Sequence, residues 1–99
     1  MPAAARQTDA VKTGHLCDGT TTLAAPGQGT VYIENLLACR ITDKTVVHDI
    51  KVGLVCVPHD APITGSSDTV YIVNKKAARK TDGCDAGTIT GGASTVFIG

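Results

Sequence analysis

Three histidines and one cysteine of this chain have the types and spacing to form a metal site. The motif Arg-x-Thr-Asp occurs three times, at Arg6–Asp9, Arg40–Asp43 and Arg79–Asp82. A soft or borderline metal ligand follows each copy within six residues, in the order His15, His48 and Cys84. Ligands at equivalent places of a repeat converge when the repeats surround an axis. A tetrahedral site needs a fourth ligand, which the remaining histidine can supply. The sequence therefore predicts a metal site made of His15, His48, His59 and Cys84.

Two other cysteines could replace one of these histidines. Cys17 is two residues from His15, and Cys56 precedes His59 in a C-x-x-H spacing that can chelate a metal. The four cysteines could also form two disulfides, but three histidines in a chain that we expect to be made in the cytoplasm favour a metal. The sequence leaves open which sulfur, if any, takes the place of a histidine.

The predicted ligand set indicates a structural ion. Four protein ligands close the coordination sphere, whereas a catalytic zinc keeps a position open for water. Asp49, Asp60 and Asp85 directly follow proposed ligands and could act as bases, so a small zinc-dependent hydrolase is the alternative function. Aspartates in such turns more commonly accept backbone N–H bonds or orient a histidine. We therefore expect zinc, less readily iron, and no enzyme activity, because three nitrogens and a thiolate suit tetrahedral coordination.

A second repeat stands in fixed register with the Arg-x-Thr-Asp boxes. The tetrads are Thr30–Ile33, Thr69–Ile72 and Thr95–Ile98. The first two begin 10 positions before Arg40 and Arg79, and counting from Thr95 past Gly99 and on from Met1 reaches Arg6 after the same interval. The third unit is thus split between the chain ends. This predicts a closed pseudo-threefold body in which the strand Thr95–Ile98 lies against Ala3–Arg6.

Each unit reads as a short β-hairpin. A tetrad strand of about four residues is followed by a turn at Asn35 or Asn74, a residue that tolerates the left-handed conformation, and then by a second short strand. Alternation buries the Val and Ile side chains of the tetrads and places Tyr32, Tyr71 and Phe97 on the other side. No 3.6-residue apolar period is present. We expect a mainly β cone of hairpins, with almost no helix, as a single domain over residues 1–99.

One of the cysteines has a plain structural interpretation. Cys39 directly precedes Arg40 and takes the place that Ala5 and Ala78 hold before the other boxes. Free cysteine behaves as a small hydrophobic residue. Cys39 is therefore predicted to be buried.

Composition excludes several classes of function. Nine basic and nine acidic side chains cancel and are scattered, which is not the pattern of a nucleic-acid-binding surface. The start of the chain lacks the apolar core of a secretory signal, and the longest apolar stretch, Val52–Val57, is too short to cross a bilayer. We expect synthesis in the cytoplasm, no nucleic-acid partner and no small-molecule substrate.

The repeats resemble the PAAR-repeat family of pointed tip proteins of contractile injection machines. The resemblance covers the whole chain and is carried by three segments, Ala4–Asp9, Ala77–Asp82 and Gly91–Gly99. The second copy departs from the family's Pro-Ala-Ala-Arg, because it reads Leu37-Ala38-Cys39-Arg40.

The resemblance implies a β-rich cone with a triangular base and a zinc ion near its apex. In that family the cone sits on the blunt end of a trimeric β-helical spike, one copy per trimer, and sharpens it for membrane piercing. Such tips belong to phage tails and type VI secretion systems, so this chain would be delivered across a target envelope. The family's zinc ligands fall in the segments that here hold His15, His48, His59 and Cys84.

Overall fold

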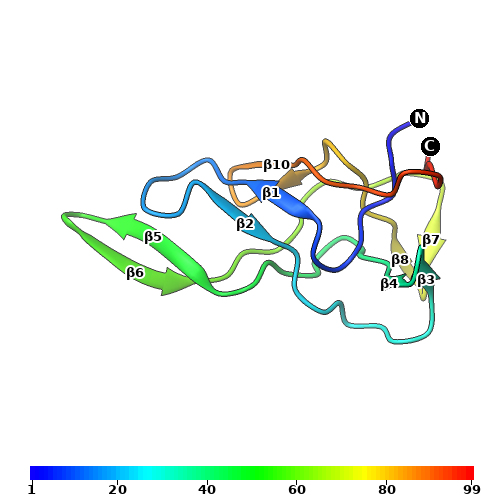
Figure 1. Cartoon of the computed structure of the whole chain (residues 1–99), viewed down its shortest axis with the longest axis horizontal. Helices are drawn as coiled ribbons and strands as arrows, with labels where there is room; N and C mark the ends of the chain where they lie inside the picture. Colours follow the sequence, from blue (N-terminus) through cyan, green and yellow to red (C-terminus); the bar gives the residue numbers. More distant parts are fainter.

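The computed structural model describes all 99 residues and consists of short antiparallel strands, turns and connections, with no helix. The body measures 41 × 24 × 21 Å. Both termini lie at one end, and a long hairpin projects at the other (Figure 1). The expected mainly β, cone-like fold is confirmed. The strands are β1 (Ala10–Lys12), β2 (Thr20–Thr22), β3 (Tyr32–Ile33), β4 (Leu36–Leu37), β5 (His48–Val52), β6 (Val55–His59), β7 (Tyr71–Ile72), β8 (Lys75–Lys76), β9 (Gly83–Cys84) and β10 (Gly87–Ile89).

A ring of three backbone hydrogen bonds defines the pseudo-threefold axis. The amide of Ala5 donates to the carbonyl of Ala78, Ala78 donates to Cys39, and Cys39 donates to Ala5, each over 3.0 Å. These are the three residues that precede the arginines of the boxes, and all are buried. Cys39 occupies the buried alanine position, as predicted. The three repeat units therefore meet around one closed centre.

The tetrads begin hairpins at the end that carries the termini, which we call the base (Figure 1). β3 pairs with β4 and β7 pairs with β8, each through a two-residue turn. Both turn residues have positive φ, at 52° and 68° for Glu34 and Asn35 and at 46° and 67° for Val73 and Asn74. This conformation matches the twist of paired strands. The hairpins are confirmed, although their regular arms are two residues long.

The two chain ends pair with each other and form the counterpart of the two base hairpins. Ala3 pairs with Phe97, and the amide of Ala4 donates to the carbonyl of Val96 over 2.9 Å. The same bond joins Ala38 to Val31 and Ala77 to Val70 in the other units. The predicted closure of the ring across the termini is confirmed.

Each Arg-x-Thr-Asp box folds into the same turn. The aspartate carboxylate accepts from the backbone amide of its own arginine over 2.7, 2.9 and 2.8 Å in the three copies, and the aspartate amide returns a bond to the arginine carbonyl. The intervening threonines, Thr8, Thr42 and Thr81, have φ between 73° and 79°. Each arginine guanidinium also donates to the carboxylate of the aspartate in its own box, so backbone and side-chain hydrogen bonds both stabilise the turn.

After each box the chain forms a second hairpin, which the sequence interpretation did not include. β1 pairs with β2 and β9 pairs with β10, and these join in one sheet of order β2-β1-β10-β9. The hairpin of β5 and β6 forms its own two-stranded sheet and reaches farthest from the base (Figure 1). We call these three the distal hairpins.

The buried apolar side chains form two small clusters. One lies at the base and contains the tetrad isoleucines Ile33, Ile72 and Ile98, with Val31, Val70 and Val96 packed against them. The other fills the middle of the body. The predicted alternation is confirmed, because Tyr32, Tyr71 and Phe97 remain 60%, 59% and 51% exposed. The chain forms no helix of the length and hydropathy needed to span a membrane.

Candidate metal centre

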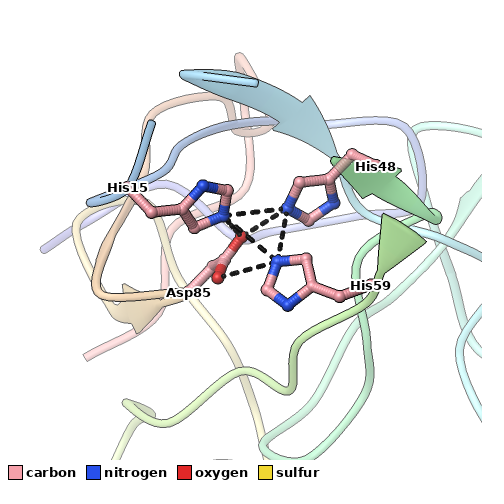
Figure 2. Close-up of side chains that lie close together, drawn as sticks. All are labelled: His15, His48, His59 and Asp85. Carbon is pink, nitrogen blue, oxygen red and sulfur yellow. Dashed lines mark hydrogen bonds and ion pairs between the residues drawn. The ribbon is translucent and has the colours of Figure 1, made fainter. Parts of the chain in front are cut away.

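The distal hairpins bring four side chains to one point. His15 lies in the loop between β1 and β2, His48 begins β5, and His59 ends β6 directly opposite His48. Asp85 is the first residue of the tight turn between β9 and β10, where its φ is 54°. Figure 2 shows the three imidazole rings and the carboxylate pointing toward a common centre. Each repeat unit contributes at least one of these groups.

The three histidine nitrogens have nearly the spacing of ligands around a tetrahedral ion, and Asp85 lies close to all three. The Nε2 atoms of the three histidines are 3.0, 3.1 and 3.2 Å apart. Oδ2 of Asp85 is 2.8 Å from Nε2 of His15 and 2.5 Å from Nε2 of His48, and its Oδ1 is 3.4 Å from Nε2 of His59. With Zn–N bonds of about 2.05 Å, a regular tetrahedron has edges of about 3.3 Å. The four groups could therefore hold a metal ion of this size.

Backbone carbonyls fix the orientation of two imidazoles. Nδ1 of His15 lies 3.0 Å from the carbonyl oxygen of Leu16, and Nδ1 of His48 lies 2.9 Å from that of Val46. A carbonyl only accepts, so each Nδ1 carries a proton, and Nε2 of the neutral ring has a lone pair that can bind a metal ion. Without a metal ion, Nε2 of either ring donates a hydrogen bond to Asp85 only when that ring is protonated and positively charged. The arrangement therefore favours a bound metal.

Asp85 is the charged member of the group. Its side chain and that of His48 are each 5% exposed, against 24% for His59. Burial disfavours the carboxylate, but hydrogen bonds from His15 and His48 outweigh burial and lower the pKa of Asp85. Burial likewise opposes the charged form of His15, yet its bonds to the Leu16 carbonyl and to Asp85 raise the pKa of this histidine. A divalent metal ion bound at this centre would contact one negatively charged group, the carboxylate of Asp85.

Of the four predicted ligands, the structure brings together the three histidines and places Cys84 elsewhere. The thiol of Cys84 is buried in the central apolar cluster, where burial, with Asp85 adding to it, raises its pKa to about 11. Asp85, the next residue, turns into the site in its place. Successive side chains at a hairpin point in different directions, so a shift of one residue exchanges thiol and carboxylate. The sequence signals for Asp85 were its place directly after Cys84 and the turn-like Asp85-Ala86-Gly87.

The remaining two cysteines are joined to each other. Cys17 and Cys56 form a disulfide with their Cα atoms 6.0 Å apart, so neither is available as a ligand. The preference for metal over disulfides was therefore wrong for this pair. The two residues are 39 positions apart, and only the folded chain brings them together.

Comparisons with known proteins do not assign the chain to a group. No protein-family model matches it, and no curated protein is significantly similar to it.

Adjacent substitutions will separate the two candidate fourth ligands. We expect Asp85→Ala to weaken zinc binding by at least about 100-fold, because it removes the only charged group of the site. The matched variant, Cys84→Ala, will keep its zinc affinity while losing about 1 to 2 kcal/mol of stability from the central cluster. Competition with a chromophoric chelator measures both affinities. If Cys84→Ala lost its zinc affinity and Asp85→Ala kept it, the fourth ligand would be the Cys84 thiolate.

Proposed function

We propose that this protein is the tip of a trimeric β-helical spike in a contractile injection machine, held together by a structural zinc ion. The base supports this proposal most directly. Three aromatic side chains, Tyr32, Tyr71 and Phe97, occupy equivalent positions of the three units and are all more than half exposed. A single chain with this pseudo-symmetry can offer each subunit of a homotrimer a similar contact. Exposed aromatic residues are also typical anchors of protein interfaces.

The metal is proposed to be zinc in a structural role. Three imidazole nitrogens and one carboxylate are a ligand set that suits zinc better than the octahedral ions. Asp85 offers a fourth ligand group beside the three imidazole nitrogens, and a fourth protein ligand would fill the position that a catalytic zinc leaves to water. This arrangement supports a tip without turnover over the alternative of a small zinc-dependent hydrolase.

The end opposite the base is apolar, which supports transient contact with a target membrane. Leu54, at the turn of the β5–β6 hairpin, is 97% exposed, and its neighbours Val52 and Val55 are more than half exposed. Leu16, whose carbonyl accepts from the Lys51 amide of β5, adds exposed apolar surface beside this hairpin. We propose that the chain is assembled on a phage tail or secretion spike and enters the target envelope with this end first.

Mixing the chain with the β-helical trimer of its own machine tests the proposal. We expect a complex of one chain per trimer by multi-angle light scattering, because the pseudo-threefold base covers the whole trimer end. Tyr32→Glu combined with Tyr71→Glu should weaken this complex by about 100-fold, since two anchors are lost. Leu54→Glu, at an apolar position of the other end that is 97% exposed, is the control and should bind normally. Three chains per trimer, or loss of binding only in the control, would refute this orientation.

A further inference from the structure

The Cys17–Cys56 disulfide lies beside the candidate metal centre. Cys17 is two residues after His15, and Cys56 is three residues before His59. Both cysteines are exposed, whereas the free cysteines Cys39 and Cys84 are buried. An exposed disulfide is open to thiol–disulfide exchange, and a buried thiol is not. The molecule thus has one accessible redox pair, and it connects two of the segments that carry ligands.

The disulfide connects the loop after β1 to β6, the second strand of the β5–β6 hairpin. The backbone hydrogen bonds between this loop and the hairpin are made to β5. The loop after β1 binds β5 through three hydrogen bonds, from Asp18 N to Asp49 O, from Lys51 N to Leu16 O and from Asp49 N to the Asp18 carboxylate. Its link to β6 is the disulfide, together with the contact between His15 and His59. β6 is otherwise held by its pairing with β5, and a two-stranded hairpin is marginal by itself, so these cross-links add to what fixes β6. The disulfide and the metal hold the same two segments.

We propose that Cys17–Cys56 is a redox modification site that sets the affinity of the three-histidine and aspartate centre for its metal ion. This inference rests on the metal centre of the proposed function. Along the chain, His15 and His59 are 44 positions apart. Through the disulfide, the path from one to the other contains only seven residues, both histidines included. A shorter path lowers the entropy cost of bringing the two ligands together. The logarithmic dependence on loop length corresponds to about a tenfold difference in affinity.

The exchange partner is a dithiol or a thiol–disulfide oxidoreductase. In reduction, one thiolate of the partner attacks a protein sulfur and forms a mixed disulfide, and its second thiol then releases the protein. The protein pair gains two electrons and two protons to become two thiols, and the partner dithiol becomes a disulfide. Oxidation runs the same steps in reverse with an oxidised partner. We expect a chain made in a reducing compartment to hold its metal less tightly until this bond forms.

The first test compares zinc affinities without a reducing agent. The double variant Cys17→Ser with Cys56→Ser removes the bond and leaves no thiol at either position. Its zinc affinity, measured by competition with a chromophoric chelator, should be about tenfold weaker than that of the oxidised protein. Val55→Ser, at the exposed neighbour of Cys56, keeps the disulfide and is the matched control. Circular dichroism at saturating zinc verifies that each variant is folded.

The second test uses the native sequence and does not depend on the variant folding. Linkage is reciprocal, so zinc must stabilise the disulfide by the same factor. In glutathione redox buffers, saturating zinc should shift the thiol–disulfide equilibrium about tenfold, or lower the midpoint potential by about 30 mV. Equal affinities and equal midpoints would overturn the proposal. Tighter zinc binding without the disulfide would also overturn it, and in the reduced native chain this would indicate Cys17 or Cys56 as a ligand. Failure of oxidised and reduced protein alike to bind zinc would instead refute the metal centre itself.

Discussion

Removal of the metal ion will destabilise the protein by several kcal/mol, and up to an order of 10 kcal/mol if the ion is bound as tightly as in small zinc domains. Chelation leaves three imidazoles and a carboxylate crowded within 4.8 Å without the charge that holds them. The chain has only small apolar clusters to compensate for this loss. Urea unfolding with excess zinc, and again with excess chelator, measures the difference. Elemental analysis of the purified protein should give about one zinc per chain.

Variants at the centre provide the control for this experiment. His48→Ala removes a buried ligand, so its unfolding should no longer respond to zinc or to chelator. Asp60→Ala, at an exposed residue next to His59 that is not in the cluster, should respond as the native protein does. An unfolding free energy that is the same with zinc and with chelator would show that the centre contributes nothing to folding.

Asp43→Ala will be the most damaging single change among the three boxes, with an expected loss of about 3 to 5 kcal/mol. The Arg40 side chain is only 5% exposed, so without Asp43 its charge is left buried and unpaired. The carboxylate also accepts from the amides of Arg40 and Gly27, over 2.9 Å in both cases. Thermal and urea unfolding of the variant provide the measurement.

The equivalent aspartates are matched controls within the same molecule. Asp9 and Asp82 make the same turn, but the side chains of their partners Arg6 and Arg79 are 13% and 21% exposed and can reach water. We expect Asp9→Ala and Asp82→Ala to cost about 1 to 3 kcal/mol each. Equal losses at all three positions would mean that the shared backbone bonds, and not the buried guanidinium, dominate the stability of the boxes.

Most features of the fold that could be predicted from the sequence follow from the register of the repeats. Because tetrads and boxes recur at one interval, they indicated a closed pseudo-threefold body with Thr95–Ile98 against Ala3–Arg6, and the structure pairs Ala3 with Phe97. Repeated motifs impose repeated local structure, so a single correct register places every copy. The distal hairpins differ in length among the units and lack a common motif, and they were missed for that reason.

The candidate centre was predictable to the level of segments, but not of every side chain. The convergence of His15 and His48 follows from their places after the boxes, and the need for a fourth ligand points to the remaining histidine, His59. The choice between Cys84 and Asp85 depends on which way a side chain points at a turn between two-residue and three-residue strands, and ligand chemistry alone favoured the thiol. The disulfide depends on a contact between two distal segments, which no local spacing encodes.

The pairing at the base also affects how fast the protein folds. Ala3 pairs with Phe97, 94 positions along the chain, so closing the base brings together segments that are very far apart in sequence. The entropy of this large loop must be lost before the contacts between its ends can form. We therefore expect the base to close late in folding, after the hairpins whose strands are close in sequence.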